Sequence, residues 1–152
     1  MRLGVISDTH GLLRPQAVQA LRGCDALLHA GDIGSSEILE ALRSLAPVTA
    51  VRGNNDNSPW ARELPLAVTI EVDGVRVHTL HEIKLLAVDP AAEGLRVIVS
   101  GHSHRPAMET RAGVLYFNPG SAGPRRFTLP VAVGILEISR GTVSARIIEI
   151  EV

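Results

Sequence analysis

The sequence has little cysteine, few aromatic residues and no excess of either charge, and each shortage excludes a class of protein. The single cysteine, Cys24, cannot form an internal disulfide or close a zinc site made of several thiolates. Aromatic residues make up 3% of the 152 residues, too few for a groove that stacks the bases of single-stranded nucleic acid. The formal net charge is −1, so we do not expect binding to long nucleic acid or to an anionic membrane.

Long hydrophobic runs are also absent. No apolar run approaches the roughly 20 residues of a membrane-spanning helix, and the first residues lack the cleavage-site pattern of a secretory signal peptide. Hydrophobic residues still make up 45% of the chain, which is enough to bury a core. We therefore expect a single cytoplasmic domain over residues 1–152, with no membrane partner.

The first half of the chain alternates short β-branched runs with amphipathic stretches, a pattern typical of βαβ units around a parallel sheet. Pro15 favours the first turn of a helix and Gly23 its end, while Ser35 or Ser36 can cap a second helix. The expected strands cover 3–7, 26–30 and 48–51, and the expected helices cover 15–21 and the stretch from the serine cap through Leu45.

The second half looks antiparallel. Asp73-Gly74 and Arg140-Gly141 are hairpin signals, each between two apolar runs. We expect a short helix within 84–94, interrupted near Pro90. The expected strands cover 66–72, 75–80, 96–100, 114–117, 131–138 and 142–150. The whole pattern predicts an α/β fold whose strands are stacked between helical layers.

Polar residues stand at the ends of most of these strands. Open α/β sheets bind ligands at the carboxyl ends of their strands. Six polar segments follow predicted strands, and the first five would therefore bring Asp, Asn and His side chains to one edge of the sheet. In chain order the segments are Asp8-Thr9-His10, Gly31-Asp32, Gly53-Asn54-Asn55-Asp56, His81, Gly101-His102-Ser103-His104 and Asn118-Pro119-Gly120-Ser121.

Each of these segments has an ordinary structural explanation when it is taken alone. Asp, Asn and Gly favour turns, and a lone histidine at a strand end is more often hydrogen-bonded than metal-bound. The two alternating histidines, His102 and His104, are hard to explain as core residues, and the combination indicates a metal site. Mixed Asp, Asn and His ligands suit Mn, Fe, Ni or Zn. The candidates outnumber the ligands of one ion, which points to two ions sharing a bridging carboxylate.

The order of these motifs resembles that of the calcineurin-like metallophosphoesterases, and more narrowly of the small YfcE-type phosphodiesterases. The matching motifs are Asp8-x-His10, Gly31-Asp32, Gly53-Asn54-x-Asp56, His81 and Gly101-His102-x-His104, with Asn118-Pro119-Gly120-Ser121 and Arg125 typical of the subgroup. The resemblance implies a four-layer α/β/β/α sandwich of two mixed sheets flanked by helices. It also implies hydrolysis of a small phosphodiester by a hydroxide that bridges two divalent ions, with homodimers or homotetramers common among relatives.

The resemblance assigns roles position by position. Three residues would bind one metal ion (Asp8, His10 and His104), three would bind the other (Asn54, His81 and His102), and Asp32 would bridge both. Manganese is the first choice for the ions, with Ni²⁺, Zn²⁺, Fe²⁺ and Mg²⁺ as alternatives. The expected catalytic residues are His10, Asp32 and Asn55, and the expected substrate contacts are Asn55 and Arg125. Arg126 is an alternative to Arg125, and both arginines can equally be solvated surface residues.

Two positions depart from the family pattern. Asn55 stands where the wider superfamily has a histidine that is thought to protonate the leaving group, and an amide cannot do so. General-acid help contributes roughly 10²–10⁴-fold, so we expect modest rates and a preference for leaving groups that depart without a proton. Glu82 stands where the family often has glycine, and its side chain would shape or crowd the substrate pocket.

The remaining polar residues receive structural interpretations. We expect His29 to be buried with its ring hydrogen-bonded, His78 to be structural or exposed, and Cys24 to be a small buried hydrophobe. Asp56 is expected to orient the loop of Asn54. The alternative to an enzyme is a metal-binding scaffold of the same fold that binds partner proteins, as a retromer subunit related to this family does. The missing acid at Asn55 keeps that alternative open.

Overall fold

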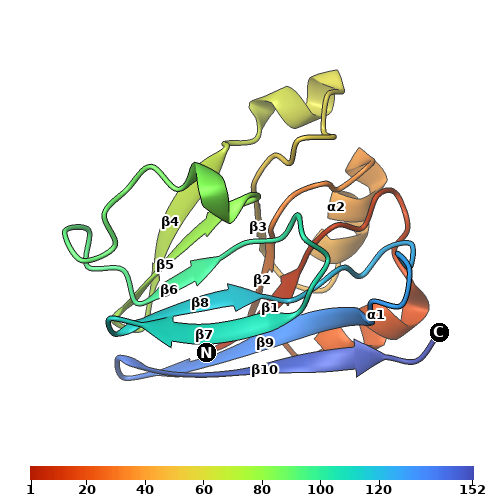
Figure 1. Ribbon diagram of the computed structural model, residues 1–152. Helices are drawn as coiled ribbons and strands as arrows, with labels where there is room; N and C mark the ends of the chain where they lie inside the picture. Colours follow the sequence, from red (N-terminus) through yellow and green to blue (C-terminus); the bar gives the residue numbers. More distant parts are fainter.

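The first strand of the chain lies at the centre of a five-stranded mixed sheet, sheet A, in the order β10-β9-β1-β2-β3 (Figure 1). The computed structural model describes residues 1–152. Strands β1, β2 and β3 are parallel, whereas β9 runs antiparallel to β1 and to β10. The strand bounds are β1 (Arg2–Ile6), β2 (Ala26–His29), β3 (Val48–Ala50), β9 (Val131–Ser139) and β10 (Thr142–Ile150).

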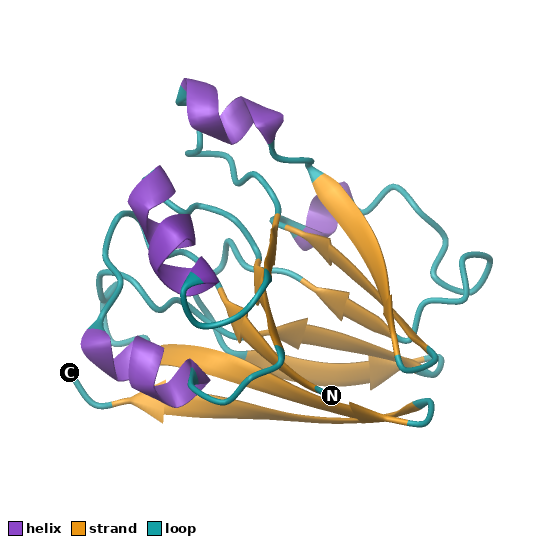
Figure 2. Ribbon diagram, turned by 180° about the vertical axis from the view of Figure 1, so that it is seen from behind, coloured by secondary structure: helices purple, strands orange, loops and turns teal.

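Two short helices, α1 (Pro15–Leu21) and α2 (Ser36–Arg43), pack on the same face of sheet A (Figure 2). Both were expected from the sequence, and Pro15 occupies the first turn of α1, where a missing N–H costs nothing. Ser35 stands at the N-cap of α2, although its side chain makes no capping hydrogen bond. The buried residues of the helices form one apolar cluster with Ile6 and Leu27 of the sheet.

Sheet B contains the middle of the chain, in the order β4-β5-β6-β8-β7. Its three inner strands, β5, β6 and β8, are parallel, and only its edge strands β4 and β7 are antiparallel to their neighbours. The expectation of an antiparallel second half is therefore wrong for the inner strands of this sheet. The bounds are β4 (Ala67–Val72), β5 (Val75–Leu80), β6 (Val97–Val99), β7 (Ala107–Arg111) and β8 (Val114–Asn118).

The chain crosses from β5 to its parallel neighbour β6 without an α-helix, which explains why the sequence hid the parallel arrangement. The connection contains one 3₁₀ turn, η2 (Ile83–Leu85), followed by irregular backbone, so it lacks the helical periodicity that marks a βαβ unit. The helix expected within 84–94 is thus reduced to this turn. A second 3₁₀ segment, η1 (Pro59–Glu63), follows β3 and was not expected.

The two sheets pack face to face around the central core. Alternate residues of each strand face opposite sides, so Val97 and Val99 of β6 join the core between the sheets while Ile98 joins a cluster on the outer face of sheet B. Leu86 and Val88 of the connection pack against that outer cluster. The predicted α/β/β/α arrangement is confirmed, with η2 and the connection forming the thin outer layer on sheet B.

Three hairpins share one turn geometry, in which two consecutive residues have positive φ. The sequence predicts the turns at Asp73-Gly74 and Arg140-Gly141, and a third lies at Ala112-Gly113. The third was missed because alanine seldom adopts positive φ and because every residue of β7 is exposed, which leaves no apolar alternation.

None of the helices in the structure has the length and the apolar composition that a membrane crossing requires.

Candidate metal centre

The parallel strands of both sheets end at a common edge (Figure 1). The candidate ligands come after these strand ends in the chain. Asp8 comes two residues after β1 and is fully buried, with its Oδ1 atom facing three imidazoles. The Nε2 atoms lie 3.3 Å away for His104, 3.6 Å for His10 and 3.8 Å for His81. Side chains from sheet A and from sheet B therefore meet at one carboxylate.

Asp32 follows β2 and lies across the same cluster. Its Oδ2 atom is 3.3 Å from Nε2 of His81 and 3.7 Å from Nε2 of His10. Two groups of three can each hold an ion, because their ligand atoms all lie within 4.8 Å of one another: Asp8 with His10 and His104, and Asp8 with Asp32 and His81. The first group is the one that the sequence assigned to one ion, and Asp32 lies between His10 and His81 as a bridging carboxylate would.

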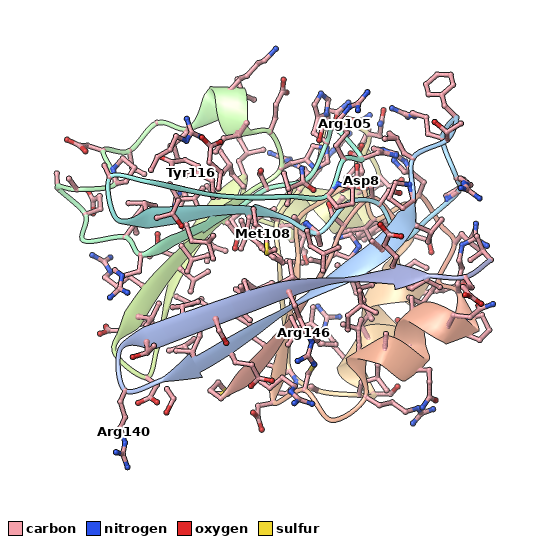
Figure 3. The ribbon with its side chains drawn as sticks, turned by 60° about the horizontal axis from the view of Figure 1, so that its bottom comes forward. Asp8, Arg105, Met108, Tyr116, Arg140 and Arg146 are labelled. Carbon is pink, nitrogen blue, oxygen red and sulfur yellow. The ribbon has the colours of Figure 1, made fainter.

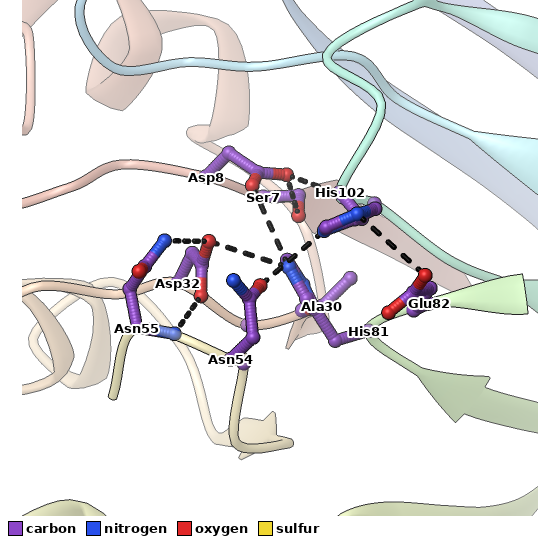
Figure 4. Close-up of polar contacts among 12 residues, drawn as sticks. Ser7, Asp8, Ala30, Asp32, Asn54, Asn55, His81, Glu82 and His102 are labelled. Carbon is purple, nitrogen blue, oxygen red and sulfur yellow. Dashed lines mark hydrogen bonds and ion pairs between the residues drawn. The ribbon is translucent and has the colours of Figure 1, made fainter. Parts of the chain in front are cut away.

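Asn54 and His102 lie beside His81, at the more exposed side of the cluster (Figure 4). Nδ1 of His102 is 3.3 Å from Oδ1 of Asn54, and the His81 and His102 rings meet edge to face with centroids 5.2 Å apart. Nε2 of His102 is also 3.7 Å from Oε1 of Glu82. The structure thus brings all seven predicted ligands into one region.

The backbone is strained at most of these ligands. A positive φ costs a non-glycine residue about 1–2 kcal/mol, and such strain concentrates at functional sites. The other non-glycine residues with a positive φ lie mainly in the hairpin turns. Five of the seven predicted ligands have this conformation: Asp8 (φ 55°), His10 (φ 46°), Asp32 (φ 56°), His102 (φ 70°) and His104 (φ 62°).

Three buried polar atoms of the predicted ligands have no hydrogen-bond partner: Nδ1 of His104 and, at the centre, Oδ1 of Asp8 and Nε2 of His81. Nδ1 of His81 donates to the backbone oxygen of Ala30 at 2.7 Å, which leaves the Nε2 lone pair free to bind a metal. Unpartnered buried polar atoms are costly, and a divalent ion with oxygen and nitrogen ligands would satisfy the two at the centre. The residues present therefore fit the metal ions that the motif pattern implies.

The two carboxylates are ionised strongly enough to serve as ligands. Burial alone would raise the pKa of Asp8, but contacts with His10, His104 and Ser7 outweigh burial and hold this pKa well below its usual range. Ser7 donates to Oδ2 of Asp8 at 2.6 Å. Burial alone would also raise the pKa of Asp32. Contacts with His81 and Asn55 outweigh burial and lower this pKa.

The pKa values of two imidazoles that face these carboxylates, those of His10 and His81, are raised. The neighbouring Asp8 carboxylate raises the pKa of His10, although burial and the positive charge of Arg126 oppose this. Burial alone would lower the pKa of His81, but Asp32 and Asp8 outweigh it and raise this pKa. The polypeptide thus concentrates negative charge at the two aspartates, where cations are expected to bind.

Asp56 ties the two loops that carry Asp32 and Asn54. Its buried carboxylate accepts hydrogen bonds from the backbone N–H groups of Ile33 (2.9 Å), Gly34 (3.2 Å) and Gly53 (2.9 Å). The expected orienting role of Asp56 is confirmed.

His29 is fully buried and its ring is satisfied at both nitrogens. Gly31 N–H donates to Nδ1 at 3.1 Å, which leaves Nε2–H to donate to Oγ1 of Thr9 at 3.0 Å. Burial lowers the pKa of His29 to about 3, so the ring is neutral. The structural interpretations of His29, of the buried His78 and of the buried Cys24 are confirmed.

The segment from Asn118 to Ser121 makes hydrogen bonds to the backbone of two loops that carry predicted ligands. Asn118 donates through Nδ2 to the backbone oxygen of Gly101 at 3.0 Å, and Ser121 donates to the backbone oxygen of Asp8 at 3.0 Å. Sequence reasoning noted this segment but gave it no such role. Its position at the end of β8, which includes Asn118, was the available signal.

The two arginines considered as phosphate contacts differ in their surroundings. Arg125 donates from Nε to the backbone oxygen of Leu129 at 3.3 Å, within its own loop. Arg126 is exposed, and its charge acts on the pKa of His10. The role of Arg125 in substrate binding stays a prediction.

Similarity to known proteins agrees with this geometry. A probable metallophosphoesterase of Methanothermobacter thermautotrophicus is 36% identical over 163 residues, covering 97% of this chain and 92% of that protein. Phosphodiesterase YfcE of Escherichia coli is 28% identical over 162 residues, covering 90% and 88%. The crystal structure of Vps29 from Chaetomium thermophilum has a TM-score of 0.79 at 19% identity, covers 99% of this chain and 95% of that chain, and shows the same fold.

Residues 1–141 match the family model of the calcineurin-like phosphoesterase superfamily domain, which spans nearly the whole chain. The motif order, the two mixed sheets and the clustered ligands point the same way, and the resemblance seen in the sequence is confirmed. The chain belongs to the calcineurin-like phosphoesterase superfamily.

Proposed function

We propose that the protein is a phosphodiesterase that hydrolyses a small phosphodiester with two bound divalent ions. The observation that carries the proposal is the pair of buried carboxylates, Asp8 and Asp32, whose oxygens face the imidazoles of the cluster at 3.3–3.8 Å. Relatives named phosphodiesterase and metallophosphoesterase support the same class. The mixed oxygen and nitrogen donors suit Mn²⁺, Fe²⁺, Ni²⁺ or Zn²⁺. We propose Mn²⁺ as the first choice, with Ni²⁺, Zn²⁺, Fe²⁺ and Mg²⁺ as alternatives.

The proposed ligand sets divide the cluster. One ion would be held by Asp8, His10 and His104, which lie within reach of a common ion. The family resemblance would assign the second ion to Asn54, His81 and His102, with Asp32 shared; Asp32 and His81 also form a group with Asp8 that could hold an ion. Bound ions would activate water at neutral pH and offset the charge that develops on the phosphoryl oxygens. In the reaction, water oxygen forms a bond to phosphorus, one ester P–O bond breaks, and the electron pair leaves with the ester oxygen.

The protein's own residues hold the ligand side chains in position. Ser7 and the backbone N–H of His102 hold Oδ2 of Asp8, and Ala30 orients His81 so that Nε2 points inward. His10 has a side chain that is 24% exposed, so it can touch the substrate as well as a metal ion. These contacts keep the centre fixed before the substrate arrives.

The side chain present at position 55, an asparagine, cannot give a proton to the leaving group. The amide of Asn55 does not titrate near neutral pH, and its NH₂ group already donates to Asp32. The departing oxygen must therefore be stable as an anion or take its proton from water. We expect aryl esters to be cleaved faster than alkyl esters.

Metal-dependent hydrolysis of bis(p-nitrophenyl) phosphate tests the proposal. Metal-stripped protein is given Mn²⁺, Ni²⁺, Zn²⁺ or Mg²⁺ in turn, beside Asp32→Asn and beside Asp89→Asn, which changes an exposed carboxylate outside the site. Turnover that requires metal, is lost in Asp32→Asn and persists in Asp89→Asn is expected. If no metal raises turnover above that of Asp32→Asn, the alternative of a metal-binding scaffold replaces the proposal.

A further inference from the structure

A cavity of about 340 Å³ opens directly beside the candidate metal centre. Asn54 and His81 belong both to its wall and to the predicted ligand set, so the cavity and the centre share a boundary. The wall combines the end of β5, the residues at the start of β4, and the segment from η2 onward. Its apolar residues are Leu66, Ala67, Leu80, Leu85, Ala87 and Val88.

The apolar wall of this cavity is open to water. Leu66 is 64% exposed and Leu85 is 70% exposed, which is unusual for two leucines that line one cavity. Covering apolar surface gains about 25 cal/mol for each Å² removed from water, so an apolar group bound between them would be favoured. These two exposed leucines form the rim, and the buried Leu80 forms part of the floor.

The polar groups of the wall leave no net charge for an ionic ligand. His78 is bonded through Nδ1 to Oγ1 of Thr69 at 2.8 Å, and burial lowers its pKa, so the ring is neutral. Arg52 and Glu82 carry opposite charges. The remaining titratable residue of the wall, His81, directs its Nε2 atom at the carboxylates of Asp8 and Asp32. Glu82 also lies 3.7 Å from His102, where it would repel a second anionic group next to the phosphoryl position.

We propose that this cavity binds one ester substituent of the diester, and that this substituent is an uncharged apolar group the size of a single ring. The proposal rests on the proposed function, because the phosphoryl group must lie at the metal centre for its substituent to enter the adjoining cavity. A volume of about 340 Å³ is at the low end for ligand cavities, which run from roughly 300 to 1,000 Å³. An apolar cavity of about 150 Å³ already holds benzene, so this cavity has room for one ring with its substituents and less for a whole nucleotide or a long chain.

Competition by two phosphonates tests the inference. Phenylphosphonate and methylphosphonate are compared as inhibitors of the metal-dependent hydrolysis of methyl p-nitrophenyl phosphate. Each phosphonate carries a single substituent on phosphorus. The comparison therefore does not depend on which of the two ester groups of a diester enters the cavity. We expect the inhibition constant of phenylphosphonate to be at least about tenfold lower, as for other apolar pockets.

Two substitutions in the wall remove this preference if the cavity is responsible. Leu85→Ser makes the exposed rim polar, and Ala87→Trp fills the space; both positions are exposed, so the core is not disturbed. The ratio of the two inhibition constants should fall to near one in both variants. Met108→Ser changes an exposed apolar residue of β7 that lines a different cavity, and it should keep the ratio of the unchanged protein.

The outcomes separate this inference from the proposed function. Turnover with equal inhibition by the two phosphonates, or a preference that survives both wall substitutions, overturns the inference alone. Absence of turnover with every metal overturns the proposed function and the inference with it. A change in oligomeric state on Leu85→Ser, with the preference intact, would assign the leucine rim to a second copy of the chain and also overturn the inference.

Discussion

Asn55 holds both oxygens of the Asp32 carboxylate. Its backbone N–H donates to Oδ1 at 2.9 Å, and its side-chain amide donates to Oδ2 at 2.9 Å (Figure 4). Oδ2 is also the atom that faces His81 and His10. The residue that was singled out because it lacks an acidic proton therefore has a definite contact, which fixes the orientation of the proposed bridging ligand.

Asn55→Ala should weaken metal binding by about 10–100-fold, because it removes the hydrogen bond to Oδ2 and leaves the backbone N–H of residue 55 to hold Asp32 through Oδ1 alone. Calorimetric titration of the metal-free protein with Mn²⁺ measures this. Asn57→Ala is the matched control, since Asn57 is exposed and its side chain makes no contact with the cluster. Equal affinities for the protein and for Asn55→Ala would refute the positioning role.

Asn55→His should change which leaving groups the protein tolerates. An imidazole can donate a proton that the amide cannot, so kcat/KM for an alkyl leaving group should rise by about tenfold or more relative to that for p-nitrophenolate. Paired rate measurements on the two esters give the ratio directly. Asn55→Gln, which restores no acid, should leave the ratio low, and an unchanged ratio in Asn55→His would count against the missing-acid interpretation.

Asp56→Asn should destabilise the fold by about 1–3 kcal/mol, because an amide NH₂ would face a backbone N–H that now meets a carboxylate oxygen. Urea unfolding of metal-free protein measures the free energy of unfolding. Glu40→Gln alters an exposed carboxylate of α2 and should stay within about 0.5 kcal/mol of the unchanged protein. A loss no larger than that of Glu40→Gln would show that Asp56 does not tie the loops.

Acid should destabilise the protein through His29. Its pKa is about 3 in the folded chain and about 6.5 when unfolded, so below about pH 6.5 the unfolded chain takes up a proton that the folded chain refuses. The free energy of unfolding should then fall by up to about 1.4 kcal/mol per pH unit from this residue, from about pH 6.5 down to about 3. Above pH 6.5 both states are neutral and the contribution is constant.

His29→Asn isolates this contribution, since asparagine can still accept from Gly31 but does not titrate. Unfolding by urea at about pH 7 and at about pH 5, with a chelator present, should show that His29→Asn loses less stability on acidification than the unchanged protein. Parallel losses in the two proteins would mean that His29 is not held neutral by burial.

The ligand cluster was predictable because it depends on local signals. Asp8, Asp32 and His81 each follow an apolar run that reads as a strand, and parallel strands place such residues at one edge. His104 was predictable from its alternation with His102. The helix over Pro15–Leu21 was found with its correct bounds, since proline and glycine mark its two ends.

The contacts that depend on distant segments were not predictable. The bond between Asn55 and Asp32 joins two loops whose approach is set by the whole sheet. The cavity beside the centre draws on separate parts of the chain between Arg52 and Val88. Strand β7 carries no apolar pattern, because an edge strand with both faces exposed has nothing to bury.

The side-chain view from below also shows where the edges of the two sheets approach each other (Figure 3). Met108 of β7 lies there and lines a cavity together with Val143 and Ala145 of β10, and none of the predicted metal ligands lines that cavity. Met108→Ser is therefore a suitable control for every measurement at the metal centre.

Titration of metal-free protein with Mn²⁺, followed by hydrolysis of bis(p-nitrophenyl) phosphate, is the most direct test of the proposed two-ion phosphodiesterase. Turnover should be absent without metal, should rise with added Mn²⁺ and should saturate at two ions per chain, with no rise in Asp32→Asn. Turnover that persists in excess chelator, or that saturates at one ion and survives in Asp32→Asn, would contradict the two-ion centre.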